Sequence, residues 1–189
     1  MSYNLLKIDD FTNKDINFDL PNNNNGKILC NNIITNIYQT PKLINKSKIY
    51  NVDNNNYLDV LITNNDFLNF IKKVDKSILD EVKTKNNIWF RKELSNETIK
   101  NYFSSILKKD NNEKYCSIKI LESSKIYDEN NEKIKLEDIN EYDNVILLLT
   151  IDSIIFEESK FYVNLIGNHI KVYKQKISLT DMIKTNNIL

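Results

Sequence analysis

The sequence is poor in small and rigid residues: its 189 positions include no alanine, one arginine, two glycines and two prolines. Asparagine (32 residues) and isoleucine (28 residues) are abundant instead. Codons for the scarce types are mostly G/C-rich and those for the abundant types are A/T-rich, so much of this bias reflects a very A/T-rich gene. Asparagine runs and the excess of lysine over arginine therefore say little about function.

Long apolar runs are also absent. The longest, Val145–Ile151, contains Thr150 and has the length of a strand, not of a membrane span. The N-terminus lacks a basic region followed by an apolar core, so we expect no signal peptide, no membrane partner and a cytoplasmic location.

Few residues are available for catalysis or metal binding. Cys30 and Cys116 lie far apart, and His169 is the single histidine, so a multi-histidine metal site is excluded. Cys116 lies beside apolar Ile118 and is expected to be a small buried hydrophobe. With 26 acidic residues, adjacent carboxylates arise by chance. We therefore expect a protein without a cofactor or metal, and not an enzyme.

The length and the 41% hydrophobic content predict one domain. Residues 1–26 are polar and acidic and are predicted to form an N-terminal arm, either loosely held or added as an edge element. Residues 27–189 are predicted to form the domain itself. Short strands are expected within 27–38, at 48–52 and at 57–63, with a turn at Asn54–Asn56.

Two helices are predicted in the middle of the chain. At about 65–84, apolar residues recur every three or four positions, and Ser95 is placed to cap a second helix at about 96–107. Strands return at 115–122, in a hairpin turning at 128–132, and at Val145–Ile151. The last strands, 161–166 and 170–176, are expected to form a hairpin around Gly167–Asn168, before a closing helical turn at 179–184. This order predicts an α+β fold, most simply an OB-like antiparallel β-barrel with an inserted helical pair.

Positive charge and aromatic residues occur together in three stretches, although the formal net charge is zero. Residues 111–160 hold 6 basic and 12 acidic side chains, whereas 161–189 hold 4 and 1. In the last strand, His169, Lys171, Tyr173 and Gln175 share one face at a period of two. The candidate nucleic-acid-binding residues from these stretches are Lys42, Lys46, Lys48, Tyr50, Trp89, Arg91, Lys171, Tyr173 and Lys174.

Cations and aromatic rings on one face suit single-stranded DNA, because cations track the phosphates and rings stack on unpaired bases. The structural alternative is that these strands are merely solvated on their polar face. Trp89, in a short apolar segment, is more often a core residue than a stacking platform. His169, predicted just after a turn, is expected to be exposed and is at most a contact in the groove.

Three stretches together resemble a family of small proteins of large nucleocytoplasmic DNA viruses. They are Ile37–Leu43 (IYQTPKL), the segment from Phe67 through Trp89–Lys92 to Phe103, and Val145–Phe156 with Phe161–Lys174. The sequence departs from that family's pattern at Ile155–Phe156 and Phe161–Asn164, where the family carries Trp and Gly. The resemblance implies an OB-like, single-stranded DNA-binding protein of viral DNA replication or recombination, working in the host cytoplasm or a viral factory with replication proteins as partners.

Two functions follow from different classes of protein. The first is non-enzymatic single-stranded DNA binding, with the acidic segment 111–160 or the arm contacting a basic replication partner or covering the groove. The second is a virion-associated or protein-interaction module without nucleic acid affinity. The two differ in where the candidate residues lie: convergence on one groove favours the first, and scatter favours the second.

Overall fold

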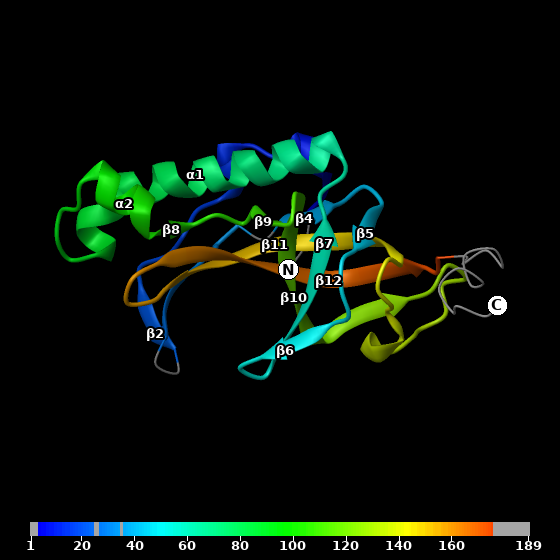
Figure 1. The fold of residues 1–189 in the computed structure, drawn as a ribbon. Coiled ribbons are helices and arrows are strands. Elements are labelled where there is room, and N and C mark those ends of the chain that lie inside the picture. Colours follow the sequence, from blue (N-terminus) through cyan, green and yellow to red (C-terminus); the bar gives the residue numbers. More distant parts are fainter. Residues whose placement is uncertain (1–3, 25–26, 35, 176–189) are drawn as a thin grey trace.

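The computed structural model describes residues 4–24, 27–34 and 36–175, so the predicted helical turn at 179–184 lies outside the described residues. The described chain forms a twelve-stranded sheet with two α-helices, and the long helix lies along one side of the strands (Figure 1). The expected combination of strands with a helical pair is confirmed. Neither helix in this part of the chain is long and apolar enough to cross a membrane.

The helices are α1 (Asn65–Trp89) and α2 (Asn96–Tyr102). The strands are β1 (Asn4–Lys7), β2 (Asn22–Asn24), β3 (Lys27–Asn31), β4 (Asn36–Gln39), β5 (Leu43–Asn45), β6 (Tyr50–Val52), β7 (Asn55–Leu61), β8 (Phe103–Ser104), β9 (Lys108–Asp110), β10 (Glu113–Tyr127), β11 (Asn144–Phe156) and β12 (Phe161–Tyr173). Three short 3-10 helices complete the described elements.

Five of the strands pair in a closed circuit. β11 pairs with β5, β5 with β7, β7 with β10, β10 with β12, and β12 returns to β11. Within the circuit, β10–β12 is parallel and the other four ladders are antiparallel. Outside it, β1–β4 and β12–β8 are also parallel, so the prediction of an antiparallel sheet is wrong for these three pairs. β11 separates β10 from β12 along the chain, and two reversals of direction bring β12 back parallel to β10.

The N-terminal segment belongs to the same core as the rest of the sheet. β1 pairs with β4 at the sheet edge, and the apolar side chains that follow it are buried. The ring of Phe11 lies edge-on to Phe70 of α1 at 5.6 Å, and Phe18 lies edge-on to Trp89 at 6.3 Å. The described part of this segment is therefore held at the sheet edge and packed against α1.

The predicted apolar stripe of α1 is buried against the sheet. A side chain caps the N-terminus of each helix. Asn64 accepts hydrogen bonds from the N–H groups of Asp66 and Phe67, and Ser95 accepts from Thr98. α1 runs five residues further than predicted because its last turn buries Trp89. α2 ends five residues early because Phe103–Ser104 leave the helix to pair with β12.

Gly167–Asn168 does not form a turn: β12 is one strand that continues through both residues. Leu148 pairs with His169 and Leu149 with Gly167, so Asn168 is the extra residue of a β-bulge. A Cβ on Gly167 would lie 3.0 Å from Ile120 Cδ1, which explains why glycine occupies this position. The predicted hairpin is therefore wrong, and the Gly–Asn pair marks a close approach of β10 instead. His169 lies within the strand, half-buried against the ring of Tyr127 at 6.4 Å.

Candidate nucleic-acid interface

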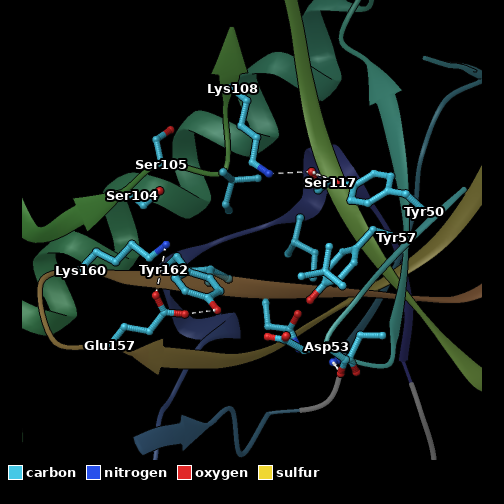
Figure 2. A pocket seen from close by; sticks show the side chains of 16 residues that line it. Tyr50, Asp53, Tyr57, Ser104, Ser105, Lys108, Ser117, Glu157, Lys160 and Tyr162 are labelled. Carbon is cyan, nitrogen blue, oxygen red and sulfur yellow. Dashed lines mark hydrogen bonds and ion pairs between the residues drawn. The ribbon is translucent and has the colours of Figure 1, made fainter. Parts of the chain in front are cut away.

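A groove of about 440 Å³ opens on the sheet where the β6–β7 hairpin, β10 and the first residues of β12 meet two connecting segments, 104–108 and 157–160 (Figure 2). We call it the tyrosine groove, because three tyrosines from different elements line it. Its polar and aromatic lining residues are Tyr50, Asp53, Asn55, Tyr57, Ser104, Ser105, Lys108, Ser117, Glu157, Lys160, Tyr162 and Asn164.

One wall of the tyrosine groove is a pair of stacked tyrosines. Tyr50 and Tyr57 face each other across the β6–β7 hairpin, and their rings lie 5.8 Å apart at an interplanar angle of 21°. The two-residue turn Asp53–Asn54 sets this register with φ angles of 50° and 61°, the left-handed values that asparagine and aspartate tolerate best. The hairpin thus presents two flat rings side by side.

A chain of hydrogen bonds fixes the polar side of this wall. The Tyr50 hydroxyl donates to Asp59 Oδ1 at 2.9 Å, Ser117 Oγ donates to the same oxygen at 2.6 Å, and Lys108 Nζ donates to Ser117 Oγ at 2.7 Å. Asp59 and Ser117 are register partners on β7 and β10. The network holds the Lys108 ammonium at the rim, next to the rings.

The opposite wall comes from the β11–β12 connection. Glu157 accepts a hydrogen bond from the Tyr162 hydroxyl at 3.0 Å and pairs with Lys160 at 3.1 Å, while Lys160 Nζ lies 5.6 Å from the centre of the Tyr162 ring. Figure 2 shows this trio across the open space from Tyr57. Each wall of the groove therefore combines tyrosine with lysine.

The third side is anchored to helix α1. Asp75 accepts hydrogen bonds from the Ser105 hydroxyl and from the Ile106 N–H, the latter at 3.1 Å. Burial raises the pKa of Asp75, and these hydrogen bonds act in the opposite direction. Through this contact the helix positions the segment that carries Ser104, Ser105 and Lys108.

The tyrosines of the groove stay neutral well above physiological pH. Burial, together with the charge of Asp59, raises the pKa of Tyr50 to about 12. Burial also raises the pKa of Tyr57 and of Tyr162, and Glu157 adds to the shift of Tyr162. The rings therefore bring no negative charge to the groove, whose lining also includes the carboxyl groups of Asp53 and Glu157.

Of the sequence-predicted residues, Tyr50 alone lines the tyrosine groove. Lys42, Lys171 and Tyr173 meet elsewhere, at the far end of β12, where the two Nζ atoms lie 4.2 Å and 5.8 Å from the Tyr173 ring. We call these three residues the Tyr173 patch. Lys174, the next residue, pairs with the buried Asp143 at 3.0 Å.

The remaining predicted residues lie in other places. Lys46 pairs with Glu113 at 2.7 Å and Asp110 at 3.4 Å, and hydrogen bonding to Glu113 raises its pKa. Lys48 is exposed in the segment before β6. Trp89 is buried edge-on to Phe18 and Phe156, in the core role that its apolar surroundings favoured. Arg91 is exposed just beyond α1.

The predicted set therefore does not converge on one groove. The residues that do converge include Tyr57, Lys108, Lys160 and Tyr162, which the sequence patterns did not single out. Tyr57 had a signal: a two-residue turn at Asp53–Asn54 places it opposite Tyr50. Lys160 and Tyr162 had none, because the β11–β12 connection reaches the groove only through the pairing of β12 with β10.

The groove offers stacking surfaces and ammonium groups. Of its two carboxylates, Glu157 is bound by the Tyr162 hydroxyl and by Lys160. Nowhere in residues 4–24, 27–34 and 36–175 do three or more His, Cys, Asp or Glu side chains gather to hold a metal ion. Both cysteines are buried, as expected for Cys116, and burial raises the pKa of Cys30 to about 12.

Comparison with known proteins identifies the family and the fold. Residues 45–182 match a family of unknown function (DUF5871), and the chain belongs to that family. No curated protein matches the sequence. Two solved structures are similar at 9% sequence identity: a C-terminally truncated single-stranded DNA-binding protein from bacteriophage Enc34 and gp2.5, a single-stranded DNA-binding protein encoded by bacteriophage T7.

The structural match extends over most of each chain. For the Enc34 protein the TM-score is 0.51, covering 86% of this chain and 98% of that one. For gp2.5 the TM-score is 0.52, covering 79% and 94%. The chain therefore has the fold of phage single-stranded DNA-binding proteins.

Proposed function

We propose that this member of the DUF5871 family is a non-enzymatic protein that binds single-stranded DNA in the tyrosine groove. The closed circuit of five strands would be the OB-like barrel that the strand pattern predicted, with the groove on its surface. The observation that carries the proposal is the convergence of Tyr50, Tyr57 and Tyr162 with Lys108 and Lys160 around one open space.

Each component of the groove has a part in such binding. Unpaired bases stack on exposed tyrosine faces, at about 1–3 kcal/mol per base. Lys108 and Lys160 lie at the rim, where phosphates would pass and release their counterions. The hydroxyl and carboxylate oxygens of the residues that line the groove can hydrogen-bond to base edges. A role in viral-type DNA replication or recombination would follow from this activity, and the resemblance to proteins of large DNA viruses remains a prediction from sequence.

The test is fluorescence anisotropy with a labelled oligo-dT of about 30 nucleotides and a duplex of equal length, over a salt series. We expect the single strand to bind more tightly and to weaken linearly with the logarithm of salt concentration, with a slope of roughly −0.7 per phosphate contact. Tyr142→Ala should bind as the parent chain does, because Tyr142 is half-exposed and lies outside the groove. Absence of binding at low salt, or equal affinity for the duplex, contradicts the proposal.

One observation favours the second candidate, a protein-interaction module. The predicted lysines and aromatics scatter over separate surfaces, and two of those lysines, Lys46 and Lys174, are paired with acids. The same assay separates the two functions, because a module without nucleic acid affinity leaves the anisotropy unchanged at every salt concentration.

A further inference from the structure

A second pocket, of about 650 Å³, adjoins the tyrosine groove. Glu157 and Lys160 line both cavities, so the β11–β12 connection forms the rim between them. From Lys160 the second pocket extends along Phe156 and Phe161 to the C-terminal end of α1. Lys160 is therefore a residue that one extended ligand could contact from either cavity.

The walls of the second pocket are largely apolar and partly open to solvent. Leu20, Ile28 and Ile88 are 66%, 48% and 54% exposed, which places three of the exposed large hydrophobic side chains of the described chain around one cavity. Phe90 packs edge-on against Phe156 at 5.5 Å and forms the aromatic side. Such walls are suited to flat, apolar faces such as those of nucleobases.

Two cationic residues that follow α1 also line this pocket. Arg91 and Lys92 are both exposed lining residues, and Arg91 is the single arginine of the sequence. Arg91 adopts a φ of 55°, which ends α1 and turns the chain back along the pocket. Together with Lys160, three basic residues line this largely apolar pocket, against two acidic ones, Glu157 and Glu158. Basic side chains beside apolar surface suit a strand in which phosphates and bases alternate.

We propose, as an inference that rests on the proposed function, that the binding site for single-stranded DNA is longer than the tyrosine groove. One continuous strand crosses Lys160 and places further bases against the apolar walls of the second pocket, with its phosphates near Arg91 and Lys92. Two observations select this occupant: the pocket shares Glu157 and Lys160 with the groove, and its three basic residues outnumber its two acidic ones, which suits a polyanion.

Trp89 supplies a local signal for this subsite. It is the single tryptophan of the chain, it lines the second pocket, and it is not among the residues that line the tyrosine groove. A change in its emission on DNA binding reports occupancy of the second pocket, whereas anisotropy of labelled DNA reports binding at either place.

The experiment measures affinity for oligo-dT over a series of lengths from about 4 to 30 nucleotides, for the full chain and for R91Q/K92Q. The matched control is K72Q/K73Q, which removes two exposed lysines of α1 that line neither cavity. We expect R91Q/K92Q to weaken the longest oligonucleotides about three- to tenfold, to flatten their salt slope by about 1.4, and to leave the shortest ones unchanged. Trp89 emission should change only with the longer oligonucleotides.

Three outcomes overturn the inference. If R91Q/K92Q binds every length as the parent does, the strand does not reach the second pocket. If it weakens short and long oligonucleotides equally, the two cations act on the groove through the general field and not at a subsite. If the parent chain binds no oligonucleotide, the proposed function itself fails, and this result is distinguishable because it appears without any substitution.

Discussion

The tyrosine groove and the Tyr173 patch both combine tyrosine with lysine, and both use β12, yet they differ in shape. Tyr162 and Tyr173 are separated along the strand by about 36 Å at the usual rise of an extended chain. At the patch, Lys42 and Lys171 cover the ring of a single tyrosine. At the groove, three tyrosines from separate elements surround an open space.

The difference shows what produces a concave site on a sheet. Period-two alternation puts His169, Lys171 and Tyr173 on one face of β12, as predicted, but a single strand face is flat and its lysines fold onto its own ring. The groove forms because the segments 104–108 and 157–160 lie across an open space from the β6–β7 hairpin (Figure 2). The two regions therefore have similar residue types, and they differ in that several segments of the chain surround the groove, whereas the patch lies on one flat strand face.

The largest expected difference between the two regions comes from removing one tyrosine ring, first in the groove and then in the patch. Tyr57→Ala should weaken binding to oligo-dT by about 1–3 kcal/mol, because it removes a stacking face and one half of the Tyr50–Tyr57 pair. Tyr173→Ala should leave affinity within about twofold. Both values come from anisotropy titrations, with thermal unfolding as the check on folding. Equal losses for the two variants would mean that the patch, too, binds DNA.

A smaller effect is expected from the cations. Lys108→Gln and Lys160→Gln should each make the salt dependence of binding shallower by about 0.7, the value for one phosphate contact on a single strand. Lys42→Gln and Lys171→Gln, which change the patch in the same way, should leave the slope unchanged. The comparison requires titrations at four or more salt concentrations. A slope altered by the patch variants and not by the groove variants would reverse the assignment.

Glu157 should oppose binding slightly, because its carboxylate holds Lys160 and the Tyr162 hydroxyl in the groove. Glu157→Gln keeps the size of the side chain and removes the charge. We expect binding to tighten by about 0.2–1 kcal/mol, the usual value of a solvent-exposed ion pair. Glu137→Gln, at an exposed ion pair with Lys135, serves as the control. Weaker binding by Glu157→Gln would indicate instead that the carboxylate orients the groove for DNA.

The smallest expected effect is that of tyrosine ionisation, which changes the free energy of unfolding at alkaline pH. The folded-state pKa of Tyr50, about 12, lies above the ordinary value of 10.0, so the folded state holds the phenolic proton more tightly than the unfolded state does. This contribution to stability is complete below pH 10 and is lost as the pH rises from 10 to 12. Tyr50→Phe should therefore reduce the alkaline loss of stability measured by denaturant unfolding, and an unchanged alkaline loss would contradict this assignment.

The sequence by itself determined the local elements whose cause is local. The apolar stripe and the Asn64 and Ser95 caps determined that two helices form, and the alternation around Cys116 and Ile170 determined which faces of β10 and β12 are buried. The exclusion of membrane spans from the described helices likewise follows from hydropathy. These signals are strong because they depend on residues a few positions apart.

Only the tertiary structure decided the features that depend on distant pairing. Gly167–Asn168 carries the composition of a turn and forms a bulge, because β10 approaches too closely for a side chain at Gly167. Phe103–Ser104 leave a helical segment because β12 offers a partner. The groove needs the hairpin at Tyr50, the clamp at Asp75 and the β11–β12 connection to meet. No local pattern encodes that meeting, because the energy that fixes it comes from long-range strand pairing and burial.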